Sequence, residues 1–230
     1  MNGNVRASRR RLLPWLAMLC LSLWLSPAHA GEKEALRLLV IGDFYSKSPE
    51  LPYRQSWPGL LHSLLLADGV TAELDILAKP GWTSAHALNS LKQDNLQTTY
   101  EWVIVMVGVH NQQQNRSINS YRRDMKKLLR RAAQLSDGRP QRVLVMSIPD
   151  WSATRDGKNQ SVDISPAIDR YNSVLRIVSM ETLTTFLDIG SSVELARNDF
   201  SSATVHPRHF SRKLYMLWAK HLRTIIRDEP

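Results

Sequence analysis

Short apolar runs alternate with longer amphipathic patterns along most of this 230-residue chain. Runs rich in Val, Ile and Leu that end at Gly, Pro or Asp predict buried strands. These runs lie within Leu36–Ser46, Trp102–Val107 and Arg142–Ile148. Val70–Ala78 alternates polar and apolar residues and predicts a further strand, and Thr184–Ile189 predicts a fifth, weaker one. Helical spacing of apolar residues predicts helices at Ser56–Asp68, Ala85–Leu96, Ser117–Leu135, Ala167–Met180 and Phe210–Ile226. Polar stretches predict surface loops at Ser152–Ser161 and Asn198–His206.

The alternation of strands and helices predicts an α/β fold with a parallel sheet between two helix layers. With five strands, we expect a three-layer αβα sandwich in the flavodoxin-like arrangement. Ligands of such folds bind where the loops that follow the strands meet. The first strand ends at Gly42-Asp43, so we expect the functional residues to gather around this turn.

The first 30 residues have the pattern of an export signal. Four arginines precede an apolar core at Trp15–Leu25, and Ala28-His29-Ala30 is a typical cleavage site. The core is short for a membrane span, although an uncleaved anchor helix is the alternative. The sequence therefore predicts a signal peptide at 1–30, a single domain at 31–230, and a periplasmic or secreted protein with no stable membrane span after cleavage. It does not distinguish Sec from twin-arginine export.

The charge and the cysteine content exclude several classes of function. Removal of the four signal arginines lowers the net charge from +9 to +5, which is too little to indicate a nucleic-acid partner. The single cysteine, Cys20, lies in the signal, so the mature chain has no disulfide or thiol nucleophile. His110 and His206 lack a third ligand with metal-binding spacing. We therefore expect neither a metal nor a cofactor.

Four loops, in chain order, carry short motifs that resemble those of the SGNH (GDSL) hydrolase superfamily. The motifs are Gly42-Asp43-Phe44, Pro80-Gly81-Trp82, Gly108-Val109-His110-Asn111 and Ala203-Thr204-Val205-His206-Pro207. The segments GVHNQ, RVLVMSIPDW and VHP resemble sequences of the lysophospholipase-type esterases in particular. The resemblance covers the mature chain and implies the SGNH hydrolase form of the flavodoxin-like fold.

Three of the five catalytic positions depart from the pattern of the superfamily. The resemblance implies a serine nucleophile at Phe44, an oxyanion-binding asparagine at His110 and an aspartate at Ala203. Only Gly81, as an oxyanion donor, and His206, as the base, match. A phenyl ring cannot attack an ester, and the members of a triad act as a unit. We therefore predict a pseudoenzyme that binds a ligand or assists a partner in the cell envelope.

Ser46 provides an alternative nucleophile two residues beyond Phe44. If the turn were rebuilt, Ser46 could act with His206, with Asp43 or Asp199 to orient the base and His110 to bind the oxyanion. This alternative predicts an active periplasmic esterase for acyl esters of lipids or polysaccharides. Helix capping or simple surface exposure is the other interpretation of Ser46.

Two further features indicate partners. Tyr45, Trp82 and Trp151 lie on the loops at the strand ends, where aromatic side chains line acyl- or carbohydrate-binding clefts or simply pack. The helix at Ser117–Leu135 has a basic outer face that either faces solvent or binds an envelope protein or an anionic surface. This face contains Arg122, Arg123, Lys126, Lys127, Arg130 and Arg131.

Overall fold

The computed structural model describes Met1, Gly3 and residues 35–92, 96, 99–160, 163–197 and 207–228. The predicted signal peptide at 1–30 lies, apart from Met1 and Gly3, outside the described residues. The predicted loop at Asn198–His206 also lies outside them. No helix among the described residues combines the length and the apolar character needed to cross a bilayer.

Five parallel strands form one sheet in the order β2-β1-β3-β4-β5. The strands are β1 (Leu36–Gly42), β2 (Ala72–Ala78), β3 (Trp102–Met106), β4 (Val143–Met146) and β5 (Thr185–Leu187). Every residue of β3 and β4 is buried, as expected for central strands covered on both faces. The strand order confirms the predicted flavodoxin-like arrangement.

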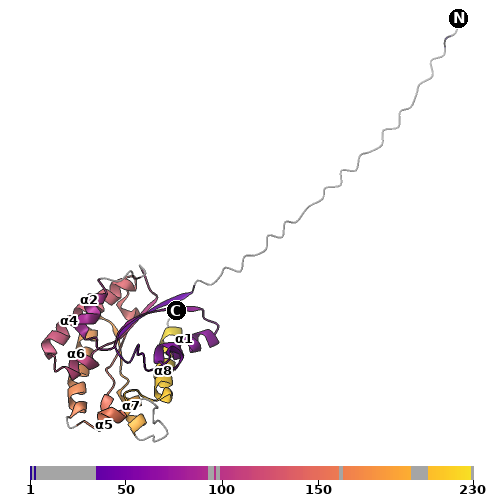
Figure 1. Cartoon of the computed structure of the whole chain (residues 1–230). Helices are drawn as coiled ribbons and strands as arrows, with labels where there is room; N and C mark the ends of the chain where they lie inside the picture. Colours follow the sequence, from indigo (N-terminus) through magenta and orange to yellow (C-terminus); the bar gives the residue numbers. More distant parts are fainter. Residues whose placement is uncertain are drawn as a thin grey trace. The chain divides into compact units, whose positions relative to one another are not determined.

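Helices cover both faces of the sheet (Figure 1). On one face, α1 (Trp57–Ala67) packs against α8 (Arg212–Asp228). On the other face, α4 (Ile118–Leu135) packs between α2 (Ser84–Ser90) and α6 (Ile164–Thr182). The predicted three-layer αβα sandwich is therefore confirmed.

Helix α1 shows how local sequence sets an element boundary. Ser56 caps the helix by accepting a hydrogen bond from the Gly59 N–H, and Pro58 occupies the first turn. Both residues suit a helix start, because the Ser hydroxyl satisfies a free N–H and Pro has none to satisfy. The helix ends before Asp68 and Gly69, and Gly69 has a positive φ of 75°.

The structure corrects several predicted boundaries. Helix α2 ends at Ser90 rather than Leu96, because Lys92 N donates to Asn89 O and closes a tight turn. The predicted surface loop after Trp151 is wrong in part, because it contains η3 (Trp151–Ala153) and α5 (Arg155–Lys158). Thr154 caps α5 by accepting from Gly157 N. The short helices α3 (Val109–Gln113) and α7 (Gly190–Arg197) also follow strands directly and were not predicted.

Candidate functional site

The turn that leaves β1 is held by a close contact between Gly42 and Ser46. A Cβ on Gly42 would lie 2.1 Å from Ser46 Oγ, so only glycine admits this serine against the strand end. Ser46 N donates to Asp43 O and closes the turn. Ser46 is 1% exposed, and its Oγ has no hydrogen-bond partner among the described residues. The hydroxyl of the alternative nucleophile therefore faces the protein interior.

Asp43 joins the β1 turn to the end of β3. Its carboxyl group accepts hydrogen bonds from Tyr45 N at 3.2 Å and from Gly108 N at 3.2 Å. Burial raises the pKa of Asp43 to about 7, because desolvation outweighs the stabilising backbone hydrogen bonds. Asp43 therefore serves as a structural link between two of the loops singled out by the sequence.

The Phe44 ring forms an aromatic stack at the position where the resemblance implies a nucleophile. It lies on the imidazole of His209, with ring centroids 4.4 Å apart and an interplanar angle of 18°. The Arg208 guanidinium lies 5.1 Å from the centroid of the same ring, within cation–π range. Phe44 is only 6% exposed. The first loop thus presents a packed ring between two side chains of the segment that precedes α8.

His209 is a site residue that the sequence reasoning missed. A hydrogen bond of 2.9 Å joins its Nδ1 to Tyr215 Oη, and another of 3.1 Å joins its Nε2 to Ser48 Oγ. Glu50 Oε2 lies 3.8 Å from the same Nε2. The only signal in the sequence was a second histidine three residues after His206, which no motif singled out.

The loop after β3 brings His110 to the site and turns Asn111 away from it. Burial lowers the pKa of His110, so its imidazole is neutral near pH 7. The Nδ1 atom of His110 is buried without a partner among the described residues. Asn111 holds the start of α2 instead: its Oδ1 accepts from Ser84 N at 2.8 Å, and its Nδ2 donates to Ser84 Oγ at 2.9 Å.

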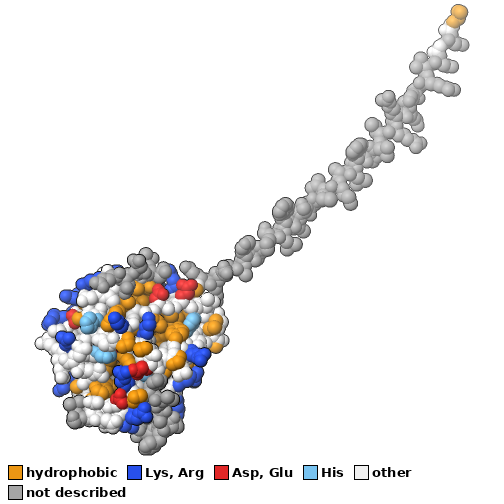
Figure 2. All heavy atoms as spheres, viewed as in Figure 1, with side chains coloured by type: hydrophobic (Ala, Val, Ile, Leu, Met, Phe, Trp, Pro, Cys, Tyr) orange, Lys and Arg blue, Asp and Glu red, His pale blue; other side chains and the backbone are white. Residues whose placement is uncertain are grey.

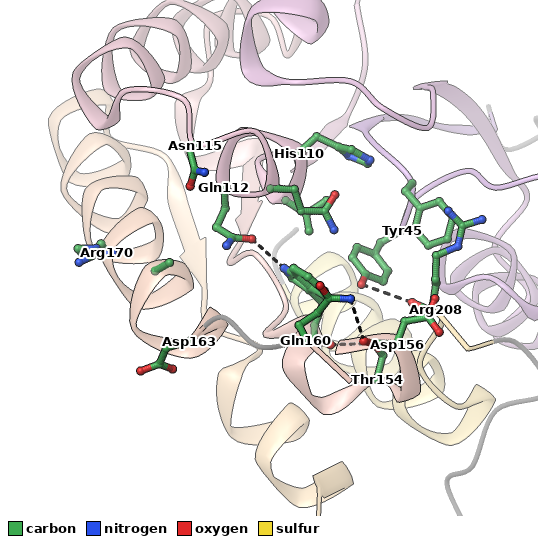
Figure 3. Close-up of a pocket in the computed structure, with 15 residues that line it drawn as sticks. Tyr45, His110, Gln112, Asn115, Thr154, Asp156, Gln160, Asp163, Arg170 and Arg208 are labelled. Atoms are coloured by element: carbon green, nitrogen blue, oxygen red, sulfur yellow. Dashed lines mark hydrogen bonds between the residues drawn. The ribbon is translucent and has the colours of Figure 1, made fainter. Parts of the chain in front are cut away.

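A pocket of about 570 Å³ opens beside these loops (Figure 3). In this view, Tyr45 and Arg208 lie on one side of the pocket, and Asp163 and Arg170 on the other. Its lining residues are Phe44, Tyr45, Val109, His110, Gln112, Gln113, Asn115, Trp151, Thr154, Asp156, Gln160, Asp163, Ala167, Arg170 and Arg208. The pocket therefore lies at the carboxyl end of the sheet, as the topology predicts.

The structure brings together only some of the predicted site residues. Phe44 and His110 share the pocket wall, whereas Ser46 and Gly81 do not contribute to it. Gly81 lies in the turn after β2 with φ of 87°, and open space surrounds the position that its Cβ would take. His206 and Ala203, together with Asp199, lie outside the described residues. The roles of these residues stay predictions.

Two of the three predicted cleft aromatics line the pocket. Tyr45 and Trp151 do so, whereas Trp82 is not among the lining residues. Trp151 is fixed in place because its Nε1–H donates to Gln112 Oε1 at 2.8 Å. The Tyr45 hydroxyl donates to Arg208 O at 3.5 Å.

The basic face of α4 is partly neutralised by α6. Arg122 and Lys126 both form ion pairs with Glu181, the latter at 2.8 Å. Arg123, Lys127, Arg130 and Arg131 are exposed. On the face drawn in Figure 2, Lys and Arg side chains are dispersed and do not form one continuous patch. Among the described residues, no group of three or more His, Cys, Asp and Glu side chains could hold a metal ion.

Comparison with known proteins gives one family and one shared fold. The model of the GDSL-like lipase/acylhydrolase family matches residues 42–215. An arylesterase from Vibrio mimicus is 33% identical over 101 residues, which cover 44% of this chain and about half (47%) of that protein. The chain has the fold of the α/β hydrolase LAE5 from the Lake Arreo metagenome, with a TM-score of 0.68, 14% identity and coverage of 84% and 95% of the two chains. The lipase/acylhydrolase of Enterococcus faecalis gives a TM-score of 0.67, 14% identity and the same coverages.

Proposed function

Because the chain belongs to the GDSL-like lipase/acylhydrolase family, we propose that it is a member that binds a ligand in its pocket without cleaving it. The relatives are named as an arylesterase and a lipase/acylhydrolase. Ester cleavage is therefore the alternative to a function in ligand binding alone.

The Phe44 ring is the observation that carries this proposal. Serine-type hydrolysis needs an oxygen nucleophile. The resemblance implies this nucleophile at the position of Phe44, whose ring stacks on His209. Ser46 does not compensate, because its hydroxyl is buried against Gly42 and away from the pocket. Attack tolerates displacements of about 1 Å at most, so a serine on the inner side of the turn cannot replace the nucleophile.

The pocket itself supports a retained binding role. Its volume of about 570 Å³ falls within the range of roughly 300–1,000 Å³ that is usual for small-molecule sites. Its walls come from five separate segments, which contain Phe44, His110, Trp151, Arg170 and Arg208. A phenylalanine in place of the nucleophile does not close such a pocket, because Phe44 forms only part of one wall.

The cellular setting of the proposal rests on the sequence. The signal-like pattern at 1–30 favours export, with the periplasm or the exterior as the site of action. A mature chain without cysteine is held by its core, which suits the periplasm. A protein of this kind would bind an acyl or carbohydrate ligand, or assist a protein partner, in the cell envelope.

A labelling experiment tests the proposal directly. The mature chain, residues 31–230, would be treated with a fluorophosphonate probe and assayed with short-chain p-nitrophenyl esters. We expect no covalent label and no turnover above the uncatalysed rate. Labelling that disappears in Ser46→Ala would overturn the proposal in favour of the active esterase that uses Ser46 and His206.

One contact favours a second candidate, namely residual ester hydrolysis through Ser48. Ser48 Oγ lies 3.1 Å from His209 Nε2, the arrangement of a nucleophile and its base. Against this candidate, Ser48 is not among the residues that line the pocket, and His209 is buried beneath Phe44. The same labelling experiment on Ser48→Ala distinguishes this candidate from ligand binding alone.

A further inference from the structure

We infer that the pocket accepts an uncharged carbohydrate chain rather than an acyl chain or an anion. This inference rests on the proposed ligand-binding function and adds the chemical class of the ligand. It follows from four properties of the described lining residues: the scarcity of aliphatic side chains, the exposed surface of an aromatic ring, the presence of carboxamide groups and the balance of charge.

Aliphatic side chains contribute little to the pocket walls. Among the described residues that line it, Val109 and Ala167 are the only aliphatic ones. An acyl chain gains affinity by burying methylene groups against apolar surface, and it would leave the polar lining groups desolvated and unpaired. A pocket walled mainly by polar side chains therefore disfavours a fatty acyl group.

The Trp151 indole provides an apolar surface on which a sugar ring can pack, because it lines the pocket and is only partly buried. Phe44 and Tyr45 also line the pocket, but they are only 6% and 4% exposed and add little to this surface. The Gln112 side chain fixes the Trp151 indole through a 2.8 Å hydrogen bond. A sugar ring has C–H faces that pack on aromatic rings and hydroxyl groups around its edge. Because the indole is already oriented, it loses little side-chain entropy on binding.

Carboxamide groups supply the polar partners that hydroxyl groups require. Gln113, Asn115 and Gln160 line the pocket and are exposed. Each carboxamide both donates and accepts hydrogen bonds, which matches a hydroxyl group that does the same. Figure 3 shows Gln160 and Asn115 at separate positions around the pocket, so a ligand of more than one sugar unit could reach both.

The charges of the described lining residues cancel. Asp156 and Asp163 oppose Arg170 and Arg208, and Arg208 also forms an ion pair with Glu50. His110 adds no charge near pH 7, because burial lowers the pKa of its imidazole. A phosphate or carboxylate ligand would need a surplus of positive charge, which the described lining residues do not offer. The balanced charge of these lining residues favours a neutral ligand.

Binding measurements on the mature chain test the inference. Isothermal titration calorimetry would compare four neutral trisaccharides (xylotriose, cellotriose, maltotriose and tri-N-acetylchitotriose) with decanoate and inorganic phosphate. We expect at least one trisaccharide to bind and decanoate and phosphate not to bind. Trp151→Ala should weaken that binding about tenfold or more, whereas Trp82→Ala, outside the pocket wall, should leave it unchanged. Gln113→Ala, an exposed substitution, should also weaken binding and serves if Trp151→Ala fails to fold.

The outcomes separate this inference from the proposed function. Failure of all four trisaccharides, or equal loss of binding in Trp82→Ala, overturns the carbohydrate assignment. Binding of decanoate or phosphate that depends on Trp151 also overturns it, but leaves ligand binding without cleavage intact. Covalent labelling by a fluorophosphonate would instead overturn the proposed function itself.

Discussion

The Phe44 ring and the His209 imidazole lie face to face, with centroids 4.4 Å apart and planes inclined by 18°. This stack closes the space between the turn after β1 and the segment before α8. Because Tyr215 and Ser48 both form hydrogen bonds with the same imidazole, the stack has little freedom to rearrange. The position at which the resemblance implies a nucleophile is thus part of the hydrophobic core.

Truncation of Phe44 should destabilise the protein. Phe44→Ala removes a ring that is 6% exposed and stacked, and substitutions of this kind cost about 3–5 kcal/mol. Chemical denaturation would measure the free energy of unfolding. Leu66→Ala is the matched control, because Leu66 is 64% exposed and should change stability by about 0.5 kcal/mol or less. Equal effects of the two substitutions would contradict the packed role of Phe44.

Asp43 should make the stability depend on pH. Its pKa is about 7 in the folded protein, raised from 3.8 by burial, so the folded state binds more protons between these values than the unfolded state. Its contribution to stability is fully present below about pH 4 and is lost as the pH rises through about 7. Denaturation midpoints measured from pH 4 to pH 8 should fall in the wild type. The fall should be smaller in Asp43→Asn, and an identical slope in both proteins would contradict the assignment.

Gly42→Ala should be destabilising because the new Cβ would meet Ser46. The added atom would lie 2.1 Å from Ser46 Oγ and 2.4 Å from Ser46 Cβ, and overpacking of this kind costs about 1–3 kcal/mol. The double variant Gly42→Ala/Ser46→Gly removes the obstructing atoms and should recover most of the loss. A double-mutant cycle read by thermal unfolding measures this coupling. Additive effects would show that the two residues do not share the space.

Asn111→Ala should loosen the start of α2. The substitution removes both hydrogen bonds to Ser84, at 2.8 Å and 2.9 Å, and leaves the buried Ser84 N–H unsatisfied, at a cost of about 1–3 kcal/mol. Hydrogen exchange should become faster at the Ser84 amide. The amides of α8 provide the internal control, because that helix lies on the other face of the sheet. Faster exchange at both helices alike would indicate global destabilisation instead.

The fold was largely predictable from the sequence. The apolar runs of β1, β3 and β4 and the alternating pattern of β2 indicate the strands of a parallel sheet. Caps such as Ser56 mark helix starts because their chemistry is local. The short helices α3 and α7 were missed because one or two turns carry too few residues for helical periodicity to show. Their positions depend on the strand ends that they follow.

The site was less predictable, because side-chain directions in a tight turn are set by tertiary contacts. The motifs located the loops that carry Phe44 and His110, and both residues line the pocket. They did not indicate that Ser46 points inward, since that depends on the missing Cβ of Gly42. They also did not indicate that Asn111 turns toward Ser84, or that His209 lies beneath Phe44, because these partners are distant in sequence.

The hydrogen bond from Gly108 N to the Asp43 carboxyl group fixes the backbones of two site loops without involving the side chains that line the pocket. The link between the first and third loops uses backbone N–H groups, which every residue except proline supplies. The side chains at positions 44 and 110 can therefore be replaced without loss of the hydrogen bonds that hold the backbones of their loops. For protein engineering, new reactive groups could be installed at these two positions with the backbone link intact, although replacement of Phe44 would also remove the packing of its ring on His209.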